Sequence, residues 1–258
     1  MRYILTANNI TKHFVTDGKK ITAADHVNFS LEKNEFCSLV GESGSGKTTL
    51  VRIISGLIFP DSGNVMCDGE ILTPKLRRKN KILCAKLQLV LQNSRTALDS
   101  CFSVYESIAE PIKNLKKCSR EEERKTVEML VEQMELPQNI LSRRSGELSG
   151  GQQKRVCIAR ALAADPDYII FDEAVSGLDA AVRKKVLDLL VRIQKSSGKG
   201  FLLITHDIAA ALYTSQRIAV MKGGRILETV KYSGDITVFQ SEYARTLINS
   251  SLLRKKRI

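Results

Sequence analysis

The spacing of apolar and polar residues changes along the chain. Near the start, Tyr3–Asn9 and Asp25–Leu31 alternate between apolar and polar residues, which predicts two antiparallel strands with one buried face. The polar segment Thr16–Lys20 predicts the turn between them. A short, mostly apolar run, Phe36–Val40, predicts a buried strand, and Thr48–Leu57 then has the spacing of a helix with one apolar face.

The middle of the chain has helical spacing throughout. Three segments, Tyr105–Asn114, Arg120–Met134 and Gln152–Ala164, predict helices, and no clear strand pattern separates them. Ser119 followed by three glutamates is a typical helix start, because acidic side chains are stabilised at the positive end of the helix dipole. We therefore predict that residues 93–157, with approximate boundaries, form a helical subdomain inserted into the rest of the fold.

The last part of the chain alternates between strand and helix patterns, which predicts a mostly parallel sheet. The predicted fold class is α/β. We expect one domain over residues 1–258, with residues 1–92 and 158–258 forming an α/β core that includes an N-terminal antiparallel β subdomain. The alternating segments are Tyr168–Phe171, Val182–Gln194, Phe201–Thr205, Ile208–Tyr213 and Arg217–Met221.

Composition narrows the class of protein. The 258 residues are 43% hydrophobic and 26% charged, which is ordinary for a globular protein with a full core. No run approaches the roughly 18 apolar residues of a membrane span. Met1–Phe14 has no apolar signal-peptide core, so we expect a cytoplasmic protein. The six cysteines form no C-x-x-C pair, which predicts reduced thiols and no cysteine metal site.

The formal charge of +12 leaves three interpretations open: a solvated surface, an anionic membrane surface or nucleic acid. Aromatic residues make up only 5% and do not alternate with basic ones, so we expect no nucleic acid. The tail Arg254–Arg257 has the charge to contact acidic lipid, but a frayed chain end is the favoured interpretation.

A glycine-rich loop follows the apolar strand Phe36–Val40 and precedes a predicted helix. It fits G-x-x-x-x-G-K-[ST], in which backbone N–H groups surround phosphate oxygens. The lysine supplies a positive charge for the β- and γ-phosphates, and the threonine hydroxyl is a ligand for Mg²⁺. The sequence thus predicts an ATP site made of Gly41, Glu42, Ser43, Gly44, Ser45, Gly46, Lys47, Thr48 and the adjacent Thr49.

Two acidic residues end the apolar strand Tyr168–Phe171. Asp172 is positioned to hold Mg²⁺ through water, and Glu173 to accept a proton from an attacking water molecule. A strand followed by a solvated acidic turn is the alternative. The glycine-rich loop elsewhere in the chain favours the catalytic interpretation.

A second glycine motif precedes the predicted helix Gln152–Ala164. Hydroxyl and backbone N–H groups at a helix start form another anion site, but one chain with one ATP site has no use for two. The simplest solution is a two-fold dimer, in which the second site of each chain covers the ATP of its partner. On its own, the motif would be read as a helix-capping loop. Its residues are Leu148, Ser149, Gly150, Gly151 and Gln152.

Together these motifs resemble the ATP-binding subunits of ATP-binding-cassette (ABC) transporters over nearly the whole chain, with a P-loop NTPase core. The resemblance implies that Gln92 links the Mg²⁺ site to the helical subdomain, and that His206 contacts the γ-phosphate. It also implies that the loop containing Ser176 and Asp179 crosses the dimer interface. Phe14 stands where a tyrosine commonly stacks on adenine, although a core aromatic residue is a fair alternative.

Residues 172–176 (DEAVS) are similar to the peptide and nickel importer branch of this family, and LSGGQQKRVCIARAL resembles its second nickel-import ATP-binding subunit. The resemblance implies an ATPase with ATP and Mg²⁺ as cofactors, working on the cytoplasmic face of the cell membrane. It implies as partners a second ATPase subunit, two membrane permease subunits and an extracytoplasmic substrate-binding protein. A heterodimer is expected by analogy.

Several residues depart from the pattern of the branch. Asn93-Ser94 stands where Asp-Pro is commoner, and Asp99-Ser100 replaces Asn-Pro. Gly177 replaces alanine. These changes affect the expected partner surfaces, not the ATP chemistry. The cysteine-bearing tail of some peptide importers is missing, which argues against an iron–sulfur cluster.

Two other functions fit the sequence less well. An ABC protein acting on DNA or ribosomes is supported only by the basic charge, and the chain has neither a long coiled coil nor a second cassette. A GTPase is disfavoured because no N-K-x-D motif is present. The transported molecule stays open between nickel, a metal chelate and a peptide, because an ATPase subunit does not contact it.

Overall fold

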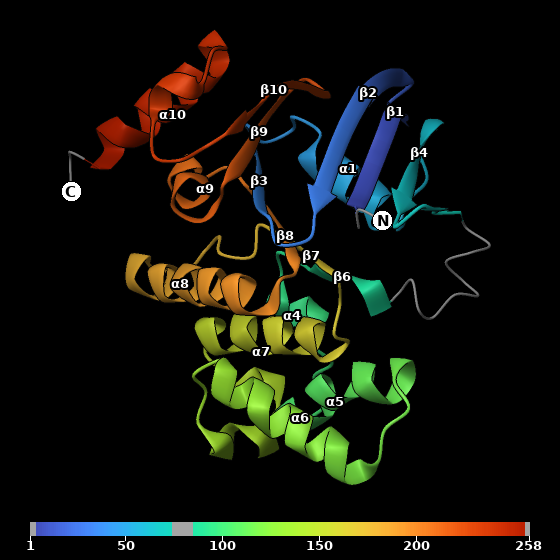
Figure 1. Cartoon of the computed structure of the whole chain (residues 1–258), viewed down its shortest axis with the longest axis vertical. Helices are drawn as coiled ribbons and strands as arrows, with labels where there is room; N and C mark the ends of the chain where they lie inside the picture. Colours follow the sequence, from blue (N-terminus) through green and yellow to red (C-terminus); the bar gives the residue numbers. More distant parts are fainter. Residues whose placement is uncertain (1–3, 74–84, 256–258) are drawn as a thin grey trace.

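The computed structural model describes residues 4–73 and 85–255, which contain two sheets (Figure 1). The first sheet is antiparallel, in the order β2-β1-β4-β5. Its first two strands are longer than the sequence pattern predicted, and they turn tightly at Asp17-Gly18. The strands are β1 (Ile4–Thr16), β2 (Lys19–Glu32), β4 (Ser62–Cys67) and β5 (Glu70–Ile71).

The second sheet has the order β10-β9-β3-β8-β7-β6. Neighbours from β9 to β6 run parallel, and only β10 pairs antiparallel, at the edge. This arrangement confirms the predicted α/β fold class with a mostly parallel sheet. The strands are β3 (Phe36–Val40), β6 (Leu87–Val90), β7 (Tyr168–Asp172), β8 (Gly200–Thr205), β9 (Arg217–Lys222) and β10 (Arg225–Lys231).

Helices form a layer beside the second sheet, far from the antiparallel one (Figure 1). This layer contains α4 (Ser94–Ala97), α5 (Val104–Leu115), α6 (Arg120–Gln133) and α7 (Gly150–Ala163), with short 3₁₀ turns at Gln138–Ser142 and Ser145–Glu147. The division of the chain at residues 93 and 157 stays a prediction. The remaining helices are α1 (Lys47–Ile54), α8 (Ala180–Ser197), α9 (Ile208–Thr214) and α10 (Glu242–Lys255), with a 3₁₀ turn at Ile236–Val238.

Reciprocal caps determine where α5, α6 and α7 begin, and at α5 the pair is Ser103 and Glu106. Ser119 accepts a hydrogen bond from the backbone of Glu122, whose carboxylate accepts one in return, at the start of α6. Ser149 and Gln152 form the same capping box at α7, so this helix begins at Gly150 and not at the predicted Gln152. The helix therefore starts inside the second glycine motif.

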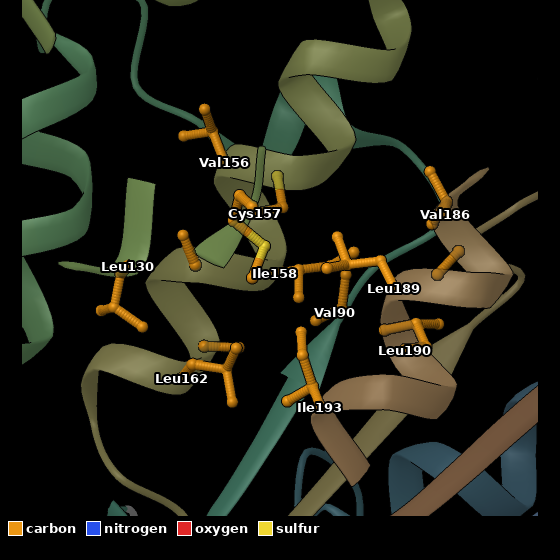
Figure 2. Packing of buried hydrophobic residues seen from close by; sticks show 14 of the residues in the cluster. Val90, Leu130, Val156, Cys157, Ile158, Leu162, Val186, Leu189, Leu190 and Ile193 are labelled. Carbon is orange, nitrogen blue, oxygen red and sulfur yellow. The ribbon is translucent and has the colours of Figure 1, made fainter. Parts of the chain in front are cut away.

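The largest buried cluster joins the helical layer to the sheet. Figure 2 shows side chains of α7 and α8 meeting beside strand β6. Ile158 and Leu162 come from α7, Leu189 and Ile193 from α8, and Val90 from β6. Because interiors are close-packed, this cluster holds the two helices against the sheet as one unit.

The substitution Leu189→Ala is expected to destabilise the fold by about 2–5 kcal/mol, because it removes a buried side chain and leaves a cavity. Leu189 is 2% exposed. Circular dichroism monitored during urea unfolding measures the change in the free energy of unfolding. Met129→Ala is the control, since Met129 is 57% exposed and its loss is expected to cost less than about 0.5 kcal/mol. Equal unfolding midpoints for the two variants would contradict the role of this cluster.

The described cysteines fall into two groups. Burial raises the pKa of Cys37 and Cys67 to about 12 and that of Cys157 to about 11. Cys101 and Cys118 are exposed, one on each side of α5. Cys84 lies outside the described residues, as do Lys256 and Arg257 of the basic tail.

Within residues 4–73 and 85–255, no helix has the length and apolar character needed to cross a membrane.

Candidate functional site

The glycine-rich loop connects β3 to α1, as its motif requires. Gly46 has φ of 103°, a left-handed conformation that favours glycine. A Cβ atom at this position would lie 2.2 Å from the backbone oxygen of Ala23 in β2. The antiparallel sheet therefore packs closely against the loop, and Gly46 is required by both the turn and this contact.

The side chain of Lys47 folds back against the glycine-rich loop and is 5% exposed. Its Nζ donates hydrogen bonds to the backbone oxygens of Gly41 at 2.8 Å and Glu42 at 2.7 Å. Desolvation lowers the pKa of Lys47, while the carboxylates of Glu173 and Asp172 oppose that shift. A positive charge is thus held between the loop and the two acidic residues.

A contact that the sequence did not predict joins the loop to the C-terminal helix. The backbone N–H of Glu42 donates a hydrogen bond to the hydroxyl of Tyr243 in α10, at 3.0 Å. The Nζ of Lys222 lies 4.5 Å from the centre of the Tyr243 ring. No motif marks this contact, because the two residues are far apart in the chain and both are ordinary surface types.

Tyr243→Phe is expected to weaken ATP binding about twofold to tenfold, because it leaves the Glu42 N–H without this partner and loosens the loop. Binding of a fluorescent ATP analogue to the full chain measures the effect. Tyr213→Phe serves as the control, since its hydroxyl bonds to Asp188, away from the loop. Affinity unchanged by Tyr243→Phe would show that α10 does not support the loop.

The two acidic residues occupy the end of β7. Asp172 is 7% exposed, and burial together with the nearby carboxylate of Glu173 raises its pKa. Glu173 has φ of 46°, outside strand geometry, and its N–H bonds to the backbone oxygen of Ile204 at 3.0 Å. The chain turns here. The carboxylates of the two residues lie beside each other at the carboxyl end of the parallel strands, where the glycine loop also follows β3.

The structure brings Gln92 and His206 together at Glu173. Nε2 of Gln92 donates a hydrogen bond to one carboxylate oxygen of Glu173 at 2.7 Å. Nδ1 of His206 lies 3.3 Å from the other oxygen. These residues follow β6, β7 and β8, which are neighbours in the parallel sheet, so their side chains meet at one edge.

Arg183 connects this edge to the loop that contains Ser176 and Asp179. It donates one hydrogen bond to the carboxylate of Asp207, beside His206, and one to the backbone oxygen of Leu178, both at 3.0 Å. The sequence did not single out Arg183, since its role depends on a contact between two loops.

Oxygen donors near the glycine loop are the kind that Mg²⁺ prefers. Thr48 is exposed on the first turn of α1, Asp172 is the last residue of β7, and Gln92 lies two residues after the end of the neighbouring strand β6. Within the described ranges, no cluster of three histidine, cysteine, aspartate or glutamate side chains could enclose a metal. The donors fit an ion shared with a nucleotide phosphate and not one caged by protein.

The second glycine motif lies at the start of α7 and lines a different cavity from the first. A cavity of about 280 Å³ is lined by residues that include Gln92, Leu148, Gly150 and Ser176. A larger one of about 600 Å³ is lined by Gly41, Ser176 and His206, among others. Ser176 lines both cavities. Of these two cavities, Gly41 of the first motif lines only the larger one, and Leu148 and Gly150 of the second motif line only the smaller one.

Phe14 lies near the end of β1 and is 41% exposed, with the Nζ of Lys12 5.7 Å from its ring centre. It is not a core residue, which removes that alternative. An exposed ring of this kind can stack on a planar ligand.

Comparison with known protein families shows which family has these motifs. The ABC transporter family model matches residues 24–176, which is more than half of the chain and includes both glycine motifs and the acidic pair. The chain belongs to the ABC transporter family. Its ATPase class and its ATP-binding cassette fold are thereby confirmed, and so is the predicted resemblance to nickel-import subunits, which the relatives bear out.

Curated relatives of this ABC ATPase include the nickel import ATP-binding protein NikE of Escherichia coli strain K12 and of Shigella sonnei. Each is 34% identical over 254 residues, covering 96% of this chain and 94% of the relative. The similarity thus extends from the antiparallel sheet to the C-terminal helix.

Solved structures of ABC cassettes are similar to this one. A dimeric post-hydrolysis structure of the ATP-binding cassette MJ0796 with ADP and Pi has a TM-score of 0.80 and 32% identity, covering 90% of this chain and all of that one. The cassette cbiO1 of Clostridium perfringens, part of the transporter complex cbiONQ, has a TM-score of 0.80 and 27% identity, covering 99% and 94%. An ABC ATPase of this fold binds and hydrolyses ATP.

Proposed function

We propose that this ABC ATPase powers the uptake of nickel, free or chelated, through partner membrane subunits. The observation that supports the proposal is the 34% identity to nickel import ATP-binding proteins over 96% of the chain. An oligopeptide or dipeptide importer is the second candidate, supported by residues 172–176 (DEAVS).

In the proposed reaction, the loop Gly41–Thr49 holds the phosphates and Phe14 stacks on adenine. Glu173 accepts a proton from the water that attacks the γ-phosphate. The hydrogen bond from Gln92 and the proximity of His206 keep its carboxylate oriented at the sheet edge. Lys47 and His206 stabilise the negative charge of the γ-phosphate, which is the main task of the protein in phosphoryl transfer.

Mg²⁺ is proposed to be held by the Thr48 hydroxyl, the Gln92 amide oxygen and Asp172. The ion supplies charge neutralisation between the β- and γ-phosphates when it is bound. The raised pKa of Asp172 reflects its burial beside Glu173, and a nearby cation would favour the ionised form.

The proposed assembly contains a second ATPase subunit, as a heterodimer, with two membrane permease subunits and an extracytoplasmic binding protein, at the cytoplasmic face of the membrane. Two observations support a dimer. Gly41 of the first glycine motif and Gly150 of the second line separate cavities in one chain, and the similar cassette MJ0796 was solved as a dimer. In such a dimer, residues Leu148–Gln152 of one chain cover the nucleotide of its partner, and Ser176 and Asp179 cross the interface.

A groove of about 460 Å³ supports docking of a membrane subunit. It runs between the end of β6 and the helical layer and is lined by residues that include Leu91, Thr96, Pro111 and Arg160. Leu91 is 42% exposed. The departures at residues 93–94 and 99–100 lie in the chain segment beside this groove, and Asn93 and Ser94 also line the cavity of about 280 Å³ that contains Gln92 and Gly150.

Uptake measurements in source cells test the proposal. Cells lacking this chain would be supplied with the wild-type chain or with Lys47→Ala, and uptake of radiolabelled nickel and of a labelled peptide would be measured. Loss of nickel uptake alone, with no rescue by Lys47→Ala, is expected. Loss of peptide uptake alone would favour the second candidate, and no change in either would overturn the importer assignment.

A further inference from the structure

Lys154 is a buried cation that the proposed reaction does not use. It lies on the second turn of α7, two residues after the second glycine motif, and is 2% exposed. Desolvation lowers its pKa, and Cys157 and Asp172 oppose that shift. A buried ammonium group is unfavourable unless hydrogen-bond acceptors surround it. The groups that accept hydrogen bonds from Lys154 therefore indicate its role.

Among the described residues, the Lys154 ammonium has two hydrogen-bond acceptors, and both belong to the segment that carries Gln92. Nζ donates to the backbone oxygen of Gln92 at 2.8 Å and lies 3.2 Å from that of Leu91. The side chain of Gln92 in turn donates to Glu173. Gln92 is thus held at its main chain by Lys154 and at its side chain by Glu173.

These contacts form a continuous connection between two different surfaces. At one end, Ser149 caps α7 and belongs to the motif proposed to cover the nucleotide of the partner. At the other end, Glu173 belongs to the nucleotide site of this chain. Because a helix turn is rigid, a displacement of the start of α7 moves Lys154 with it, and hence the main chain of Gln92.

We propose that Lys154 is a positioning residue that couples the two nucleotides of the dimer, by connecting the helix that covers the nucleotide of the partner to Gln92 at the nucleotide of its own chain. The inference rests on the proposed dimeric arrangement. Coupling of this kind is reciprocal for binding, so each nucleotide changes the affinity for the other. The expected size is about 5-fold to 150-fold, the usual range for coupled sites.

The test uses the complete transporter, purified from source cells through a tag on this chain, with wild-type, Lys154→Met and Lys154→Gln versions. ATP hydrolysis is measured against ATP concentration. The wild-type complex is expected to show a sigmoidal dependence. Lys154→Met is expected to bring the Hill coefficient to about 1 and to lower kcat more than it changes KM, because the sites then respond independently. Lys154→Gln retains an N–H donor and is expected to restore part of the cooperativity.

Two controls separate coupling from folding. Lys195→Met removes an exposed lysine from α8 and is expected to leave the ATP dependence unchanged. Thermal unfolding identifies any variant that fails to fold. In addition, the effects of Ser149→Ala and Gln92→Ala on kcat are compared singly and together. When Lys154 is present, the effect of the double substitution on kcat is expected to differ from the product of the two single effects. In the Lys154→Met background, the double effect is expected to equal that product.

An unchanged Hill coefficient in a folded Lys154→Met complex would overturn the inference. So would a wild-type complex without cooperativity, or equal non-additivity in both backgrounds. Failure of the proposed function looks different: a complex whose nickel uptake is insensitive to Lys47→Ala refutes the importer assignment whatever Lys154 does.

Discussion

Glu173→Gln is expected to lower the rate of ATP hydrolysis at least about 100-fold while ATP still binds. A general base contributes roughly 10²–10⁴-fold to such reactions, and the amide cannot accept the proton. The amide keeps the size of the side chain, and Gln92 can still donate to its oxygen. Steady-state phosphate release and binding of a fluorescent ATP analogue measure the two effects separately.

The control for this prediction is Glu132→Gln, which makes the same chemical change at an exposed position of α6. It is expected to hydrolyse ATP like the wild type. If Glu173→Gln retained the wild-type rate, the assignment of the base would be wrong, and Asp172 would become the next carboxylate to test. Loss of binding along with turnover would instead indicate that Glu173 shapes the phosphate site.

Lys47→Ala is expected to weaken ATP binding at least about 10-fold, and turnover with it. Hydrogen bonds to charged groups contribute about 1.5–3 kcal/mol, and Lys47 is the buried cation of the glycine loop. Its ammonium group, which bonds to the loop oxygens, is the one proposed to meet the phosphates. Titration with an ATP analogue measures the affinity.

Lys195→Ala, an exposed lysine on α8, is the matched control for charge. Thermal unfolding of both variants shows whether loss of the bonds to Gly41 and Glu42 disturbs the fold. Wild-type affinity in a folded Lys47→Ala chain would exclude a phosphate-binding role for this lysine.

The sequence predicted the parts of the fold whose signals are local. The strand Phe36–Val40 is mostly apolar and fully buried, and the glycine motif after it requires a helix, so β3, the loop and α1 were identified together. Strand β10 was not predicted. It lies at the sheet edge with alternating half-buried residues, and Leu227 is 43% exposed, so its apolar signal is weak. Helix α10 was also not predicted, since over residues 242–250, where side chains are described, only Ala244 and Ile248 are buried.

The residues of the candidate site also differ in how well the sequence predicted them. Lys47, Asp172 and Glu173 lie in motifs from which their chemical roles were predicted directly. Gln92 and His206 came from the family resemblance, since a lone glutamine or histidine after a strand has no specific signal. The contacts of Tyr243, Arg183 and Lys154 were not predicted at all. They join segments far apart in the sequence, and only the folded chain brings them together.

The burial of Cys37, Cys67 and Cys157 has a practical consequence for observing motion. Thiolates react with maleimides and thiols do not, so buried groups with a raised pKa resist labelling at neutral pH. Cys101 and Cys118 are exposed at the two ends of α5. With Cys84 and one of these two thiols replaced by serine, the other natural thiol would accept a single environment-sensitive dye beside α5. The chain therefore offers a native position from which fluorescence can report a change in the surroundings of the helical layer when ATP binds.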